Sequence, residues 1–519
     1  MARVRKKPNQ QLAESLKIAK SIAKDSVLQS NLLDRTHRER LFRAGCLTEV
    51  IRGWYLLTSP DASNNGSTAW FGGFWTFAKR YMDERFGENE YCVSAECSLN
   101  FHAGDTTIPK QVIILTKKES NSNVKLIHDT SIFLRTDVKN FPGEIEQYNG
   151  IPIMSLPNAI CRLSSFYYKN FPRNIEIVFK MSNLSPSDIS RALLTHQSPA
   201  SAERIIGAYK QLNEEAKAKQ IYDDLIAADF TLKDVNPFEE YIPKLGNFRV
   251  TSPHAARIRL IWNSMREAVE KILPTSPGFL ADSNKTISII QETYVQDAYH
   301  SLSIEGYQVT EELIEKIEKG LWDPENIEAD KQQKDAMAAK GYFEAFKTVI
   351  LSIRCVLDGV PPGKVLEDDL QKWYRELFTP SLKANLVPPE RLAGYRNSPV
   401  YITNSRHVPP PRTAILDCME TLFDLLKNEP NAGVRAVLGH FIFVFIHPYI
   451  DGNGRMGRFI LNLMLISGGF NWTIVRVERR AEYMNALEEA STKENIVPFA
   501  EFIKSEIEHW HERILKLQK

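Results

Sequence analysis

The sequence predicts a multidomain protein, with a winged helix and a small α+β domain first and a mainly helical domain with one β-hairpin after them. Three observations lead to this prediction. The chain has 519 residues, about three times the length of an average domain. Short candidate helices and strands alternate up to residue 225, and almost every segment after residue 285 has helical periodicity. We place the parts at residues 1–60 (winged helix), 61–225 (α+β domain), 226–284 (linker and one helix) and 285–519 (helical domain).

The composition is that of an ordinary globular protein. Hydrophobic residues make up 43% and charged residues 25% of the chain, which excludes a disordered or fibrous protein. The six cysteines are too scattered for a disulfide framework or a zinc site, and they favour a reducing compartment. No apolar run reaches the ~18 residues of a membrane span, and none follows the basic N-terminus. We therefore expect a cytoplasmic protein that makes no membrane contact.

The first 60 residues have the outline of a winged helix. Segments 11–24 and 34–44 have the pattern of short helices, and 47–59 is predicted to be a hairpin that turns at Gly53. Residues 1–53 hold 12 basic and 5 acidic side chains, which favours DNA as their partner. The expected recognition helix and wing carry Arg35, Arg38, Arg40, Arg43 and Arg52. The alternative is a solvated basic tail without a partner.

Residues 61–225 mix the two kinds of secondary structure. We predict a helix over 70–86, strands over 111–116 and 131–135, and a helical stretch from the cap Ser185 to about residue 225. Together with the winged helix, this part resembles AbiEi-type antitoxin proteins through the segments RAGCLTEVIRGWYLLTSP and SAECSLNFHAG…TIPKQVIILT. It contains no recognisable catalytic signature, so the resemblance implies an antitoxin-like module.

The rest of the chain is predicted to be helical with one exception. Helices are expected at 254–273, 285–303, 309–320, 328–357, 365–378, 411–428, 432–446, 455–468, 479–491 and 496–516. The exception is 397–406 (NSPVYITNSR), a β-hairpin candidate closed by three consecutive prolines at 409–411.

One segment, FIHPYIDGNGRMGR at residues 445–458, combines the residue types of phosphate chemistry. An apolar helix delivers His447 to its C-terminal end, where Pro448 stops it. A tight turn follows at 451–454, and a new helix starts near Arg455. Backbone N–H groups in such a turn, just before a helix N-terminus, form an anion site.

The polar side chains of this segment suit a phosphoryl or nucleotidyl transfer. Arg455 and Arg458 are three residues apart, so both can clamp phosphate oxygens from one helix face. Asp451 is a hard oxygen ligand suited to Mg²⁺. His447 can act as a base near neutral pH.

The segment resembles the signature of the Fic family, HPFx[D/E]GNGRxxR, with Tyr449 in place of the usual Phe. The likeness extends over about 285–503, through the upstream helix AVLGHFIFVFIHP, the hairpin YRNSPVYITNSRHVPPP and the segment EYMNALEEASTKENIVPFAEFI. It implies a Fic fold whose hairpin is a flap. It also implies that AMP is transferred from ATP-Mg²⁺ to a Ser, Thr or Tyr hydroxyl of a target protein, with self-modification as an option.

The resemblance implies a role for each residue of the segment. His447 would deprotonate the attacking hydroxyl, and Asp451 would hold Mg²⁺ across the phosphates. The nucleotide phosphates would be bound by Gly452, Asn453, Gly454, Arg455 and Arg458. Gly454 favours nucleotidyl transfer, because the related Doc branch has Lys there and transfers a phosphoryl group.

Two further sets of residues follow from the same resemblance. Tyr483 and Ser491 would lie at the adenine end, on the helix after the motif. The flap at 397–406 would dock the target protein, with main-chain pairing along Val400, Tyr401, Ile402 and Thr403.

A second motif resembles the inhibitory pattern of the family, [S/T]xxxE[G/N]. Ser301 and Glu305 share one face of a helix expected at about 289–305, and Gly306 can end that helix. In the family, this Glu pairs with the second arginine, here Arg458, and keeps ATP out of productive alignment. The alternative is that Glu305 is a solvated residue at a helix end. Removal of AMP by the same site stays open.

Two function hypotheses follow. The first is a self-inhibited protein adenylyltransferase. The second is a DNA-binding transcriptional regulator or antitoxin-like module with a regulatory Fic domain, supported by the basic residues 1–53. The resemblance also allows a homodimer, and with the cysteine usage it favours a bacterial cytoplasm.

Overall fold

The computed structural model describes residues 8–58, 66–118, 121–138, 141–181, 183–246, 250, 252–278, 282–321 and 330–517. The chain divides into two compact units. Unit 1 consists of residues 1–257 together with 401–408, and unit 2 consists of 258–400 and 409–519. The basic residues at 1–7 and the predicted helix start at 328–329 lie outside the described residues.

Unit 1 begins with two helices and a small antiparallel sheet. Helix α1 (Pro8–Ile22) and helix α2 (Arg35–Arg43) accompany strands β1 (Val27–Gln29), β2 (Leu47–Ile51) and β3 (Trp54–Leu57), in the order β1-β3-β2. The predicted turn at Gly53 is present, and its φ of 89° is one that glycine tolerates best. A separate small core forms here, because Ala19, Leu28 and Leu41 bury their side chains against one another.

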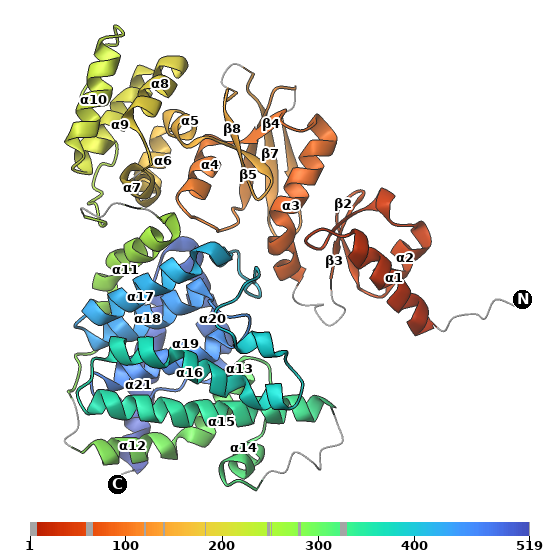
Figure 1. The fold of residues 1–519 in the computed structure, drawn as a ribbon, viewed down its shortest axis with the longest axis vertical. Helices are drawn as coiled ribbons and strands as arrows, with labels where there is room; N and C mark the ends of the chain where they lie inside the picture. The colour runs from red at the N-terminus through yellow and green to blue at the C-terminus, as the bar shows by residue number, and fades with distance from the viewer. Residues whose placement is uncertain are drawn as a thin grey trace, which may run out of the picture. The chain divides into compact units, whose positions relative to one another are not determined.

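The next part of unit 1 is a mixed sheet covered by helix α3 (Gly66–Phe86). Its strands β4 (Tyr91–Val93), β5 (Gln111–Thr116), β6 (Ser122–Lys125) and β7 (Ser131–Thr136) have the order β4-β5-β7-β6, and only β5 and β7 are parallel. Val112 and Ile114 on one face of β5 share a core with aromatic side chains of α3. Helix α4 (Ala95–His102) follows β4, and β8 (Ile145–Tyr148) and β9 (Ile151–Met154) form a separate hairpin (Figure 1).

Six short helices complete the first 226 residues. They are α5 (Leu156–Cys161), α6 (Ser165–Asn170), α7 (Pro172–Lys180), α8 (Pro186–His196), α9 (Pro199–Gln211) and α10 (Glu215–Ile226). The prediction of one helical stretch from Ser185 to residue 225 is therefore wrong in its continuity. The chain turns at Gln197 and Asn213, which have φ values of 50° and 59°, and such left-handed residues end a helix.

Unit 2 is a helical bundle around a large apolar core. Its helices are α12 (Ser283–Glu292), α13 (Tyr294–Ile304), α14 (Glu311–Glu318), α15 (Asp330–Leu357), α16 (Pro362–Lys383), α17 (Ile415–Asn428), α18 (Ala432–Ile446), α19 (Asn453–Ile466), α20 (Arg480–Lys493) and α21 (Val497–Leu517), preceded by α11 (Pro253–Ile272). Helix α18 is buried on all sides, with Val444 as its one half-buried position. Among the described residues, no helix is long and apolar enough to cross a membrane.

Two predictions in this half need correction. The inhibitory helix expected at 289–305 is interrupted, because α12 ends at Glu292 and α13 starts at Tyr294. No strand forms over 397–406 in this described stretch. Proline removes backbone donors at Pro399 and again at 409–411, and Asn404 is left-handed with φ 61°.

The loop over 401–408 belongs to unit 1, and its polar groups bond there instead of to each other as a hairpin. The Ile108 N–H donates to the Arg406 carbonyl at 2.9 Å, and the Ser67 hydroxyl donates to Asn404 Oδ1 at 2.8 Å. The Tyr401 ring lies so close to Gly72 that a Cβ there would be 3.0 Å from it. Residues 401–406 are predicted to belong to a hairpin, but contacts with Ser67, Gly72 and Ile108 hold them as a loop.

Candidate functional site

The segment 447–458 connects two packed helices of unit 2. Helix α18 ends because His447 adopts the left-handed conformation (φ 52°, ψ 58°), and its N–H donates to the Phe443 carbonyl at 3.0 Å. Helix α19 starts after Gly452, whose φ is 84°. A Cβ at Gly452 would lie 2.9 Å from the Phe378 ring, so both conformation and space favour glycine here.

The loop between the helices is held from inside by Asn453 and Tyr449. Asn453 accepts a hydrogen bond from the Tyr449 N–H at 3.0 Å and donates one to the Tyr449 carbonyl at 2.9 Å. The Tyr449 ring is buried and stacks on Tyr374 with 3.8 Å between ring centroids, and its hydroxyl donates to Gln371 Oε1 at 3.0 Å. A tyrosine can therefore replace the usual phenylalanine, because its buried hydroxyl has a partner.

His447 is held as a neutral base. Its Nδ1 lies 3.1 Å from the Val444 carbonyl, which makes Nδ1 the protonated nitrogen and leaves the lone pair on Nε2. Burial lowers the pKa of His447 to about 4, although the hydrogen bond to Val444 opposes this shift. The imidazole is therefore uncharged near pH 7 and able to accept a proton.

Two buried arginines lie on the first turn of α19. The Arg455 guanidinium lies between the rings of Tyr307 and Phe378, at 5.2 Å from each centroid, and the residue is 1% exposed. Arg458 is 4% exposed. Arg455 Nε and Arg458 Nη1 are buried donors without a hydrogen-bond partner among the described residues. Such orphaned donors fit an anionic ligand, because native structures rarely leave buried polar groups unpaired.

Asp451 provides a carboxylate at the edge of this anion site. Its Oδ1 accepts from the Gly452 N–H at 2.6 Å and lies 3.3 Å from Arg455 Nη2, and the side chain is 44% exposed. Within the described chain, no group of three or more His, Cys, Asp or Glu side chains could hold a metal alone. One carboxylate beside a phosphate site nevertheless fits Mg²⁺, which commonly binds through one or two carboxylates and substrate phosphates.

Glu305 reaches the same site from the end of α13. Its Oε1 lies 2.7 Å from Arg458 Nη2, while Arg458 Nε donates to the Ser301 hydroxyl at 2.8 Å. Gly306, with φ 87°, turns the chain away directly after it. A Cβ added to Gly454 would clash with Glu305 Oε1, so this carboxylate sits directly against the turn at 451–454. The site thus contains an internal anion.

The other residues predicted for the site lie in different surroundings. Tyr483 is 2% exposed, and its hydroxyl bonds to His440 Nε2 at 2.7 Å in the core. Ser491 is half-buried on α20. Val400 is the last residue of unit 2 before the loop, and Tyr401, Ile402 and Thr403 belong to unit 1.

Arg396 is a residue of the site that the sequence analysis missed. It is 4% exposed, and its Nε donates to the His447 carbonyl at 2.8 Å. Its guanidinium also donates to the carbonyls of Ser398 (3.1 Å) and Pro410 (2.6 Å), on either side of the 401–408 loop. In the sequence, Arg396 is simply an arginine shortly before Pro399. That pattern does not distinguish a buried arginine that binds several carbonyls from an arginine on the surface.

The helix–loop–helix at 447–458 thus holds a neutral histidine beside buried arginines with unpaired donors, an arrangement that suits an anionic ligand. Residues 364–465 match the Fic/DOC family, so this region is a Fic domain. Similar proteins include the protein adenylyltransferase fic-1 of Caenorhabditis elegans, 27% identical over 237 residues, 44% of this chain and 43% of that protein. A probable protein adenylyltransferase of Aquifex aeolicus is 30% identical over 180 residues, 34% of this chain and 52% of that protein.

The chain spans about half or less of the length of these curated relatives. Among solved structures, Fic-1 residues 134–508 from C. elegans match with a TM-score of 0.38 and 19% identity, over 66% of this chain and 92% of that one. The relatives named here come from an animal and a bacterium, so they do not restrict the source of this chain.

Proposed function

We propose that this chain is a protein adenylyltransferase that transfers AMP from ATP to a hydroxyl of a target protein. The observation that supports it best is that one helix–loop–helix carries both the neutral His447 and the unpaired buried donors of Arg455 and Arg458. The names of the curated relatives point to the same activity.

In the proposed reaction, the target hydroxyl oxygen attacks the α-phosphorus of ATP. His447 Nε2 takes the hydroxyl proton as the new O–P bond forms, and the bond from the α-phosphorus to the bridging oxygen breaks. Pyrophosphate leaves with the electron pair of that bond. Arg455 and Arg458 stabilise the charge that develops on it, and they are effective because they are buried and already in place. Mg²⁺ held at Asp451 would neutralise phosphate charge.

We also propose that Glu305 inhibits this reaction. Its carboxylate occupies Arg458 Nη2 and lies against Gly454, where the phosphates of ATP would bind. Phosphate and carboxylate compete for the same donors, and two anions in one buried site repel each other. Ser301 strengthens the closed arrangement, because its hydroxyl accepts from Arg458 Nε.

Label transfer from [α-³²P]ATP tests both proposals. We expect weak labelling of protein by the wild type, strong labelling by Glu305→Gly and none by the double variant Glu305→Gly/His447→Ala. Gel bands then separate self-modification from modification of a target in a cell lysate. If Glu305→Gly transfers no label from ATP or from the other nucleoside triphosphates, the adenylyltransferase proposal is wrong.

Glu429→Gly is the matched control for Glu305→Gly. Glu429 is also the C-cap residue of a helix, α17, with a φ of −84° against −81° for Glu305, and it also pairs with an arginine, since its Oε2 lies 2.8 Å from Arg266 Nε. If Glu429→Gly activates as strongly as Glu305→Gly, the activation reflects a loosened fold instead of a released Arg458.

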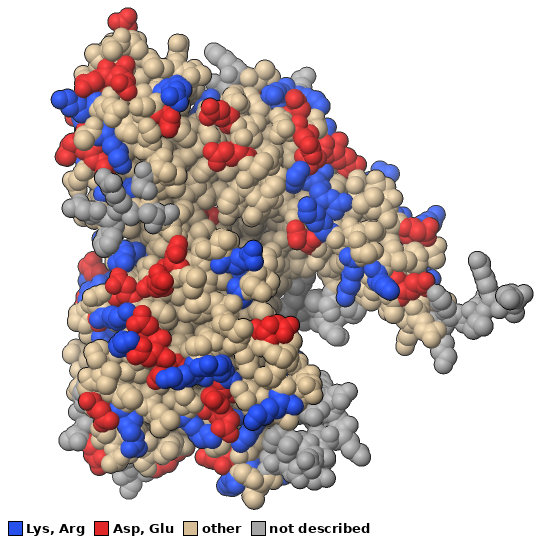
Figure 2. All heavy atoms as spheres, in the orientation of Figure 1, with Lys and Arg blue, Asp and Glu red and all other residues tan. Residues whose placement is uncertain are grey.

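The alternative function, DNA binding by the N-terminal residues, rests on helix α2. Arg35 and Arg43 have side chains 82% and 81% exposed, and the one ion-pair partner of each within the described part of the chain is Glu39. Such a surface pair stabilises little. Arg38 and Arg40 instead bond to Ser30 and Ser15. On the face shown in Figure 2, Lys and Arg are interspersed with Asp and Glu. Salt-dependent retention of a DNA duplex, lost in Arg35→Gln/Arg43→Gln, would support this function.

A further inference from the structure

A cavity of about 610 Å³ lies in unit 1, apart from the Fic domain sequence. Its floor is the face of β5 that carries Gln111, Ile113 and Leu115, since the opposite face packs on the core with α3. Its walls are the start of α4 and the α5–α6 connection. Pockets of this size typically accommodate small ligands.

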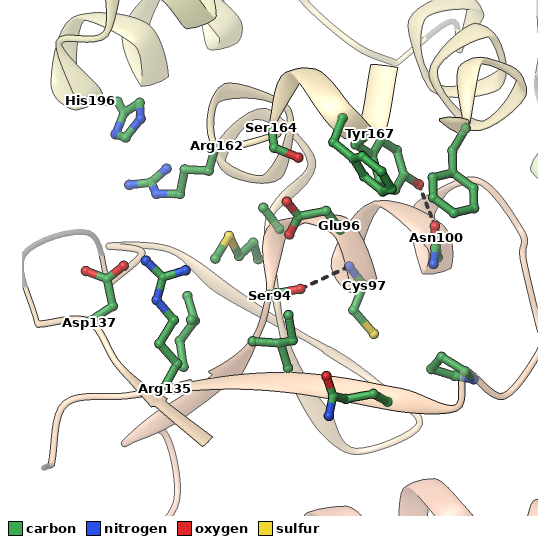
Figure 3. Close-up of a pocket in the computed structure, with 18 residues that line it drawn as sticks. Ser94, Glu96, Cys97, Asn100, Arg135, Asp137, Arg162, Ser164, Tyr167 and His196 are labelled. Carbon is green, nitrogen blue, oxygen red and sulfur yellow. Dashed lines mark hydrogen bonds between the residues drawn. The ribbon is translucent and has the colours of Figure 1, made fainter. Parts of the chain in front are cut away.

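One end of the cavity presents cationic and hydrogen-bonding side chains. Figure 3 shows Arg135, Arg162, Asp137 and His196 gathered there. The side chain of Arg135 forms no hydrogen bond or ion pair with any described residue. Arg162 is held in place by Asn158, to whose Oδ1 it donates at 2.8 Å. Burial lowers the pKa of His196, so its ring is neutral near pH 7. Two guanidiniums and one carboxylate leave this end with a net positive charge.

The opposite end is aromatic. Tyr167 lies there (Figure 3), and the ring of Phe171 is 5.0 Å from it between centroids. Phe171 is 45% exposed, and Phe166, which precedes Tyr167 in the chain and also lines the cavity, is 66% exposed. This wall is rigid, because the Tyr167 hydroxyl and Asn174 both bond to Asn100. Exposed aromatic rings beside a cavity are typical of a surface that a flat ligand covers.

Acceptors lie between the two ends. Figure 3 places Glu96 and Ser164 in the middle of the cavity. The side chain of Ser164 makes no capping bond at the start of α6, and the Glu96 carboxylate has no partner among the described residues. A carboxylate in this position can accept hydrogen bonds from neighbouring hydroxyls of a sugar.

We propose that this cavity binds a nucleoside monophosphate, with its phosphate at Arg135 and Arg162, its sugar hydroxyls at Glu96 and its base against Phe166 and Phe171. The order of cations, acceptor and aromatic rings along the cavity matches the order of phosphate, sugar and base along such a ligand. Neither inorganic phosphate nor a nucleoside would use both ends. The proposal does not depend on the adenylyltransferase activity.

Isothermal titration of the full chain with AMP, GMP, CMP and UMP tests it, with inorganic phosphate and adenosine as partial ligands. Arg135→Gln should weaken binding of the preferred monophosphate about 10-fold, the loss of one charge-assisted hydrogen bond. Phe166→Ser should weaken binding of the same monophosphate several-fold, because it removes an aromatic ring from the proposed contact with the base. Both residues are exposed, so both variants should fold, and thermal unfolding verifies this.

Two controls assign the site. Arg191→Gln removes an arginine from the exposed surface of α8, where it pairs with Asp188, and should bind as the wild type does. Arg458→Ala removes one of the two arginines proposed to bind phosphate in the Fic domain and should leave this binding in place. The proposal is overturned if no monophosphate binds at millimolar concentration, if Arg135→Gln has no effect, or if inorganic phosphate binds as tightly as the nucleotide. Binding of an oligonucleotide without binding of any monophosphate also overturns it.

Discussion

The two arginine-lined sites of this chain differ in how their charge is compensated. Arg455 and Arg458 are almost completely buried, and Arg458 is neutralised by Glu305 of the same chain. Arg135 is exposed at the end of β7 and has no partner among the described residues. A buried guanidinium needs an anion within the fold, whereas water compensates an exposed one. The proposed self-inhibition belongs to the deep site, because only there does an anion of the same chain occupy an arginine that the ligand would need.

The largest expected effect comes from a substitution in the deep site, at Arg455. In a Glu305→Gly background, Arg455→Gln should lower label transfer from ATP about 100-fold, since it removes a preorganised charge that acts on the leaving phosphates. Arg135→Gln in the same background should leave transfer unchanged. Arg455→Lys retains the positive charge between Tyr307 and Phe378. Comparing its thermal unfolding temperature with that of Arg455→Gln shows whether a loss of transfer comes from lost packing or from the lost guanidinium. Equal loss of transfer from the Arg135 and Arg455 variants would contradict the comparison.

A smaller effect is expected from Glu305→Gln, which tests whether the charge of Glu305 inhibits transfer. Glu305→Gln keeps the size of the side chain and removes its charge. We expect it to raise transfer roughly 10-fold over the wild type, less than Glu305→Gly, because the amide can still bond to Arg458 but no longer repels phosphate. Initial rates over a range of ATP concentrations measure this. Activity of Glu305→Gln at the wild-type level would show that the bulk of residue 305, and not its charge, blocks the site.

Arg396 connects the catalytic loop to both sides of the 401–408 loop. Arg396→Lys should lower kcat several-fold to ~10-fold with little change in KM for ATP, because one ammonium cannot reach the carbonyls of His447, Ser398 and Pro410 together. Steady-state kinetics in the Glu305→Gly background give this split. A change confined to KM, or a matching fall in thermal stability that accounts for the loss, would contradict a positioning role.

The smallest effect concerns the protonation of His447. Its pKa of about 4 lies below the ordinary 6.5, so the folded protein binds fewer protons than the unfolded chain between these values. The stability contribution of this group is complete above pH 6.5 and is lost as the pH falls towards 4. Imidazole NMR signals of His447, assigned with His447→Ala, should keep the neutral Nδ1–H form from pH 8 to pH 5.5. Titration near pH 6.5 would contradict this.

Local patterns predicted much of the secondary structure and the position of the motif. The helices around the motif, α18 and α19, lie within about two residues of their predicted bounds, because their apolar periodicity is strong and a proline and glycines separate them. The same reasoning merged α12 with α13 and joined three helices after Ser185. Those helices are interrupted by only one to three residues, such as Gln197 and Ser198 between α8 and α9, and a window that averages periodicity over several turns passes over such short breaks.

The sequence by itself determined that a histidine, an aspartate and two arginines occur on a helix–turn–helix with glycines between them. Only the tertiary structure decided which of these groups are buried, that Glu305 from 153 residues away meets Arg458, and that Arg396 grips the His447 carbonyl. It also decided that 401–408 is a loop of unit 1 instead of a hairpin. The physical reason is that periodicity and turn chemistry act over a few residues, whereas charge compensation and burial depend on groups brought together by the fold.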